Sequence, residues 1–132
     1  MTEPSKPAVA VVDADEQQCG KLCALLRHLD YRPTPLSSLS DLEIYLKSHP
    51  DGIVILDMDT LKTDNRFFRE LKRQAPSVYL LTLSSRSHHP GLEEAMGSHI
   101  YASLAKPLDP EEFRYCLKAI AENMAALKAA EP

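Results

Sequence analysis

The segment from Asp51 to Asp59, DGIVILDMD, constrains the fold of this chain more than any other stretch. A turn pair is followed by an unbroken run of large aliphatic residues and then by acids at positions 57 and 59. Such a run is typical of a central strand in a parallel sheet, which is covered by helices on both faces. Sites in open parallel sheets form beyond the carboxyl ends of the strands. The segment therefore predicts a buried strand that places Asp57 where chemistry is expected, unless Asp57 only ends the strand or caps the next helix.

Segments with helical periodicity alternate with short apolar runs along the whole chain. Strands are expected at 8–13, 32–36, 53–56, 77–83 and 100–105, and helices at about 15–30, 40–48, 64–74, 90–97 and 109–127. This alternation predicts right-handed crossovers and a parallel sheet with helices on both faces. A chain of 132 residues is long enough for one packed core and too short for two ordinary domains. We therefore expect one α/β domain over 8–128, a disordered lead-in at 1–7 and a tail at 129–132.

Capping residues indicate where the helices start. Side chains at the N-cap accept hydrogen bonds from the free amides of the first turn. Asp15 and Asp109 fit this position for the first and last helices, and Ser40 with Glu43 forms a capping box for the second. Pro90 fits the first position of the fourth helix.

Charge and composition exclude several functional classes. A net charge of -4 without a basic run gives no electrostatic footprint for direct nucleic-acid binding. The first residues contain no long apolar region before a cleavage site, and no segment approaches the ~18 apolar residues of a membrane span. Three cysteines, an odd number, fit a reducing compartment. We therefore expect a cytoplasmic protein that does not associate with membranes and that binds proteins or small molecules.

Polar residues stand at or near the ends of four expected strands. Asp13, Asp57 and Lys106 end their strands, and Thr82 lies near the end of another. If the strands are parallel, all four side chains project from the same edge of the sheet. Such a set can hold a divalent cation, present a carboxylate nucleophile to a phosphoryl group and neutralise the added charge.

With these residues in this order, the sequence resembles the receiver domains of two-component response regulators from about Ala8 to Leu127. The resemblance implies a flavodoxin-like (CheY-like) doubly wound sheet of five parallel strands in the order 2-1-3-4-5, with five helices. It also implies a phosphoprotein of a phosphorelay that has no enzymatic activity beyond self-dephosphorylation.

The resemblance gives each of these residues a role. Asp57 would accept the phosphoryl group from the phosphohistidine of a sensor kinase. Asp13 would belong to the acidic pocket that binds magnesium, and Asp59 would offer its backbone carbonyl to the same ion. Thr82 would be the switch hydroxyl, and Lys106 would pair with the phosphate.

Some residues depart from the family pattern. Ala14 stands where the second acid of a pair is usual, which weakens the expected magnesium site. Leu83 replaces the usual small residue after the switch hydroxyl and would narrow access to Asp57. Ser103 has the place of the switch aromatic residue and Tyr101 lies two residues earlier, so the usual coupling from threonine to the aromatic ring does not transfer to this chain.

The implied partners are a sensor histidine kinase or phosphotransfer protein, and an output protein or an output domain outside this chain. They would be contacted through the face of the fourth helix, the fifth strand and the last helix, and a homodimer would use the same face. No direct contact with nucleic acid is implied.

Two other functions remain open from the residues. A pseudo-receiver would act as an interaction module without phosphorylation, and Ala14 and Leu83 favour it. A phosphatase of the haloacid-dehalogenase type would use ILDMDTL, with Asp57 as nucleophile and Asp59 as general acid. That family places the motif on its first strand, whereas two strands precede it here.

Overall fold

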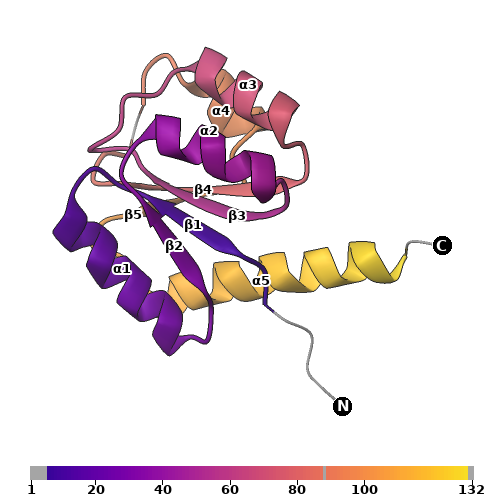
Figure 1. Ribbon diagram of the computed structural model, residues 1–132. Helices are drawn as coiled ribbons and strands as arrows, with labels where there is room; N and C mark the ends of the chain where they lie inside the picture. The colour runs from indigo at the N-terminus through magenta and orange to yellow at the C-terminus, as the bar shows by residue number, and fades with distance from the viewer. Residues whose placement is uncertain (1–5, 88, 131–132) are drawn as a thin grey trace.

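The computed structural model describes residues 6–87 and 89–130. Within this part of the chain, five strands alternate with five helices (Figure 1). The strands are β1 (Val9–Val12), β2 (Pro33–Leu36), β3 (Gly52–Asp57), β4 (Val78–Ser84) and β5 (Ala102–Ala105). The helices are α1 (Glu16–His28), α2 (Leu39–Ser48), α3 (Asn65–Gln74), α4 (Glu93–Ser98) and α5 (Pro110–Ala129). Parts of the expected lead-in at 1–7 and tail at 129–132 lie outside the described residues.

The five strands form one parallel sheet in the order β2-β1-β3-β4-β5. This is the doubly wound, flavodoxin-like order, so the predicted fold is confirmed. β3 is the central strand and all its residues are buried, as its aliphatic run predicts. Because the strands are parallel, the residues that follow β1, β3, β4 and β5 meet at one edge of the sheet. No helix in the described residues has the length and apolar character needed to cross a membrane.

Helices cover both faces of the sheet and create two cores (Figure 1). Successive residues of a strand point to opposite faces, so β3 contributes to both cores. On the face covered by α1 and α5, Ile55 packs with Val11 and Phe113. On the face covered by α2, α3 and α4, Val54 packs with Phe68. This double coverage explains why the strands read as continuous apolar runs and not as alternating ones.

The helix starts follow the capping pattern in all but two cases. Asp15 and Asp109 cap α1 and α5, as predicted. The prediction for α2 is wrong, because Ser38 is the N-cap and its Oγ accepts a hydrogen bond from Asp41 N at 3.1 Å. Ser38 has the extended backbone that an N-cap needs, whereas Ser40 already lies inside the first turn.

The fourth helix begins later than predicted and is capped from another helix. Pro90 lies in a turn before the helix, and Leu92 at the N-cap provides no side-chain hydrogen bond. The first residue of α3, Asn65, supplies the missing contact, because its Oδ1 accepts from Ala95 N at 3.1 Å. Its Nδ2 donates to Gly91 O at 2.8 Å. The oxygen and the nitrogen of the Asn65 amide group therefore both bind the start of α4 and hold it against α3.

The entry into the central strand requires a glycine. Gly52 has a φ of +116°, which other residues rarely adopt. A Cβ atom at this position would lie 2.7 Å from Ala8 O. That oxygen is fixed, because it accepts a hydrogen bond from Ile53 N at 2.9 Å. The junction of β1 and β3 therefore excludes a side chain at position 52.

Candidate functional site

The carboxyl edge of the sheet brings together acidic side chains and a lysine. Asp57, the last residue of β3, is 2% exposed, and Asp13, directly after β1, is 3% exposed. Lys106 follows β5, and its Nζ forms an ion pair with Asp57 Oδ1. The same Nζ lies 2.9 Å from Asp59 Oδ2. The structure therefore places Asp13, Asp57 and Lys106 at the edge where the parallel sheet predicts them.

Asp13 is held by donors that the sequence analysis did not identify. Its Oδ1 accepts from Asp15 N at 2.8 Å and from Thr60 Oγ1 at 3.0 Å, and its Oδ2 accepts from Gln18 Nε2 at 2.5 Å. Thr60 also donates its backbone N–H to Asp57 Oδ2 at 2.9 Å. Thr60 therefore connects the two buried carboxylates. The pairing depends on residues 47 positions apart, which no local pattern indicates.

The side chain of Asp59 joins Asp13, Asp57 and Lys106 in what we call the acidic cluster. The resemblance implied a role for the backbone carbonyl of Asp59 instead. Asp59 Oδ1 accepts from Ser84 Oγ at 3.2 Å, and Oδ2 accepts from Ser85 N at 3.0 Å. With Lys106, these contacts join the loops that follow β3, β4 and β5 at one carboxylate. A second acid two residues after the strand-end acid was the sequence signal for this contact.

The donors around Asp59 stabilise its charged form. Partial burial alone raises the pKa of a carboxyl group, but the hydrogen bonds from Lys106 and Ser85 outweigh burial and lower the pKa of Asp59 to about 2. Burial also lowers the pKa of an ammonium group, but Asp57 and Asp59 outweigh it and raise the pKa of Lys106. Asp59 and Lys106 are therefore a charged pair at neutral pH. A general acid needs a raised pKa, so this pair argues against the phosphatase alternative.

This shift predicts how acid affects stability. The folded-state pKa of Asp59, about 2, lies below the ordinary 3.8, so its carboxylate stabilises the fold above pH 4 and this contribution is lost between about pH 4 and 2. After allowance for partial solvent screening, we expect Asp59→Asn to remove about 1 to 2 kcal/mol of that pH-dependent stability. Urea unfolding at a series of pH values measures it. Asp51→Asn, which removes an exposed acid directly before β3, is the matched control.

Of the two hydroxyl groups near the end of β4, that of Ser84 contacts Asp59 and that of Thr82 contacts β5. Thr82 Oγ1 donates to Ser103 Oγ on β5 at 2.9 Å. Ser84 is buried at the end of β4, and its Oγ contacts Asp59. The expected strand ended at residue 83, but β4 continues to Ser84. The one-residue extension places Ser84 at the carboxyl edge.

The other residues that depart from the family pattern contribute no side chain to the cluster, although the backbone N–H of Ala14 donates to Thr60 Oγ1 at 3.2 Å. Leu83 is opposite Asp57 in the sheet register, but its side chain packs in the core under α1 and α5 and does not narrow the site. Tyr101 directly precedes β5 at the opposite edge of the sheet, where its ring contacts Tyr79 with 5.3 Å between centroids. Ala14 is exposed and has no side-chain donor.

The donor set does not fit a magnesium ion in this arrangement. Magnesium prefers oxygen ligands in a near-octahedral shell. The carboxylate oxygens of Asp13 and Asp57 already face internal donors, and Asp59 pairs with Lys106. Among the residues that the structure describes, no group of three or more His, Cys, Asp and Glu side chains is arranged to hold a metal ion. The positive charge beside Asp57 is the ammonium of Lys106.

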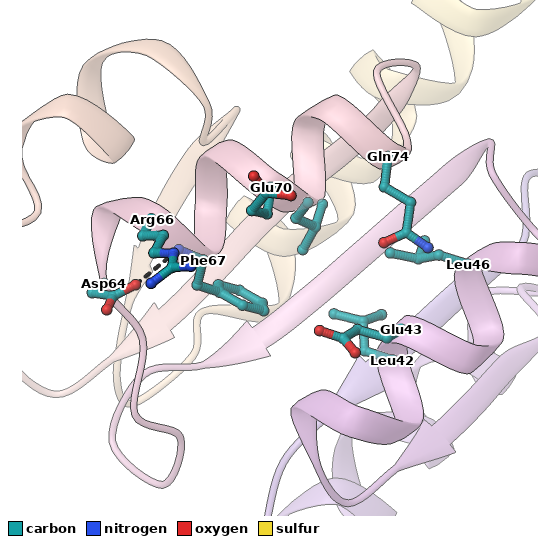
Figure 2. Close-up of a pocket in the computed structure, with 9 residues that line it drawn as sticks. Leu42, Glu43, Leu46, Asp64, Arg66, Phe67, Glu70 and Gln74 are labelled. Carbon is teal, nitrogen blue, oxygen red and sulfur yellow. Dashed lines mark hydrogen bonds between the residues drawn. The ribbon is translucent and has the colours of Figure 1, made fainter.

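A groove elsewhere on the surface is separate from this cluster. It lies between α2 and α3 and has a volume of about 260 Å³ (Figure 2). Leu42, Leu46 and Phe67 form part of its apolar wall, and Glu43 and Gln74 lie at its rim. Asp13, Asp57, Asp59 and Lys106 do not line this groove. The groove is therefore not part of the candidate site at the carboxyl edge of the sheet.

No protein-family model and no curated protein matches this sequence. Solved structures match its fold. The signal receiver domain of an HD domain-containing protein from Pseudomonas fluorescens has a TM-score of 0.84 and 22% identity, over 99% of this chain and 98% of its own. A response regulator receiver domain protein from Clostridium thermocellum has a TM-score of 0.81 and 18% identity, over 92% of this chain and 98% of its own. The beryllofluoride-activated NtrC4 receiver domain dimer has a TM-score of 0.76 and 24% identity, over 88% of this chain and 97% of its own. The chain therefore has the receiver-domain fold.

Proposed function

We propose that this chain, which has the receiver-domain fold, accepts a phosphoryl group on Asp57 from the phosphohistidine of a sensor kinase or phosphotransfer protein. Phosphorylation would then change a protein-contact surface in two-component signal transduction. The observation that carries the proposal is the buried Asp57 carboxylate at the end of the central strand, paired with Lys106. A buried strand-end acid beside a cation is the arrangement that a phosphoacceptor needs.

The proposed reaction is a phosphoryl transfer between the donor histidine and Asp57. An Asp57 oxygen forms a bond to phosphorus while the bond from phosphorus to the histidine nitrogen breaks, and that nitrogen keeps the electron pair and takes up a proton. The product is an acyl phosphate. Lys106 offsets the added negative charge, and Ser84, which replaces Thr82 in this role, is the hydroxyl that we place beside the new phosphoryl group.

Transfer from a radiolabelled phosphohistidine donor tests this function. The label should move to this chain and be released by hydroxylamine, because hydroxylamine cleaves acyl phosphates. A label that resists hydroxylamine would contradict an aspartyl phosphate.

Ala14→Asp is expected to strengthen magnesium binding. Position 14 is exposed beside Asp13, so a carboxylate there adds a ligand and a negative charge without displacing the core. We expect magnesium affinity to rise roughly ten- to hundred-fold, and phosphorylation by a small phosphodonor to become faster. Calorimetric titration measures the affinity. Ala14→Asn, which matches the shape without the charge, should gain much less, and equal affinities for wild type and Ala14→Asp would show that another group completes the site.

The proposed partners follow from the same assignment. They are a sensor kinase or phosphotransfer protein and an output protein or domain, in the cytoplasm, with contacts through the face of α4, β5 and α5. The similarity to an activated receiver domain dimer supports self-association as a further proposal, and we place it on the same face.

A second candidate function is a pseudo-receiver that binds its partner without phosphorylation. The internal donors that already face Asp13 and Asp57 favour it, because carboxylate oxygens that have internal partners need no ligand to supply them. In this case Asp57→Asn would leave partner affinity unchanged in a binding assay.

A further inference from the structure

Asp59 lies where three loops of the candidate site meet. Its carboxylate contacts Lys106 after β5, Ser84 at the end of β4 and Ser85 in the loop that leads towards α4. We infer that Asp59 is a positioning residue, which shares Lys106 with Asp57 and relays the phosphorylation state of Asp57 to the loop after β4. The relay rests on the proposed function, because the state that it reports is the phosphoryl group on Asp57.

Lys106 is shared between two acids. Its Nζ pairs with Asp57 Oδ1 and lies 2.9 Å from Asp59 Oδ2. A phosphoryl group on Asp57 carries more negative charge than the carboxylate that it replaces, so it attracts Lys106 more strongly. The same group repels the carboxylate of Asp59, which is two residues away in the chain. Both effects weaken the contact between Lys106 and Asp59.

The Ser84 hydroxyl lies between Asp59 and the loop after β4. Its Oγ donates to Asp59 Oδ1 at 3.2 Å and accepts from Arg86 N at 3.0 Å. A hydroxyl group has one proton to donate, so Ser84 cannot donate to Asp59 and to a phosphoryl group at the same time. When Ser84 turns to the phosphoryl group, the loop loses this link to Asp59. Ser85 N, which donates to Asp59 at 3.0 Å, then holds the loop without Ser84 or Lys106.

Thr82, the threonine named by the family resemblance, already has a hydrogen-bond partner on β5. Thr82 Oγ1 donates to Ser103 Oγ, so its proton is not directed to the acidic cluster. Asp59 is the side chain in the described residues whose contacts reach both Lys106 and the loop after β4. It therefore provides a connection from Asp57 to α4 that does not use an aromatic switch residue.

NMR of the backbone amides tests the relay, with Asp59→Asn as the variant and Asp51→Asn as the matched control. Intact mass, measured in parallel, establishes how much phosphate adduct forms with acetyl phosphate and magnesium. In wild type and in Asp51→Asn, adduct formation should shift the Ser85 and Arg86 amide signals, because Ser85 N donates to Asp59 and Arg86 N donates to the Ser84 hydroxyl. In Asp59→Asn, compared at a matched amount of adduct, the Ser85 response should be lost.

The same response in Asp59→Asn as in wild type would overturn the relay. If no variant forms an adduct, phosphoryl acceptance at Asp57 fails, and Asp57→Asn then decides the relay without phosphate. Without the Asp57 charge, Lys106 pairs with Asp59 alone. The Ser85 amide signal of Asp57→Asn should therefore shift relative to wild type. The double variant Asp57→Asn with Asp59→Asn should show no such shift relative to Asp59→Asn. No shift in Asp57→Asn, or an equal shift in the double variant, would refute the contribution of Asp59.

Discussion

Acetyl phosphate and magnesium are expected to add one phosphate to the wild-type protein and none to Asp57→Asn. Asn keeps the shape of the side chain but lacks the carboxylate nucleophile, so the loss should be complete. Asp57 is the acid in the described residues that is both buried at the end of the central strand and paired with Lys106. Magnesium is supplied in excess, because the carboxylates of Asp13, Asp57 and Asp59 already face internal donors. Intact mass spectrometry measures the adduct directly.

Asp51→Asn is the control for this experiment, because Asp51 lies at the other end of the same strand and is exposed. It should form the adduct to the same extent as wild type. An adduct that persists in Asp57→Asn would assign the modification to another residue. No adduct in wild type, even with Ala14→Asp, would favour the pseudo-receiver.

Gly52→Ala is expected to destabilise the fold by about 2 to 5 kcal/mol, because it combines backbone strain with a steric overlap. The φ of Gly52 is +116°, and the new Cβ would lie 2.7 Å from Ala8 O. Relief of this contact requires movement of β1 away from β3, which breaks the hydrogen bond from Ile53 N to the same oxygen. Urea unfolding measures the change in the free energy of unfolding.

Gly20→Ala provides the opposite result from the same substitution. Gly20 lies in the middle of α1, and a Cβ there meets no atom within 4 Å. Alanine in a helix interior should stabilise the protein by about 0.5 to 1 kcal/mol. Equal effects at positions 20 and 52 would show that the tight junction of β1 and β3 does not limit the choice of residue.

The sheet could be predicted from the sequence because its signals are local. The aliphatic run before Asp57 and the helical periods between the strands require a parallel sheet whose strand ends meet at one edge. This rule brings Asp13, Asp57 and Lys106 together without knowledge of any side-chain contact. The N-caps at Asp15 and Asp109 were predictable for the same reason, since each bond closes within one turn.

The contacts that complete the site could not be predicted, because they depend on strand ends and on residues distant in sequence. The expected strand ended one residue short of Ser84, so this hydroxyl was not considered, and Thr82 was named from the family resemblance. The bond from Thr60 to Asp13 joins two loops, and nothing in either loop alone indicates the other. For the same reason, the interaction of Asp59 with Lys106 required the folded arrangement of β3 and β5.

The cap that Asn65 provides has a consequence for the order in which the protein opens. A helix of six residues contains too few internal hydrogen bonds to persist alone in water. Since the amide of Ala95 is satisfied from α3 and not from its own helix, α4 and the first turn of α3 form one cooperative unit of local unfolding. Amide protons in α4 should therefore exchange with the free energy of that joint opening, and a fluctuation at Asn65 reaches α4 without any movement of the sheet.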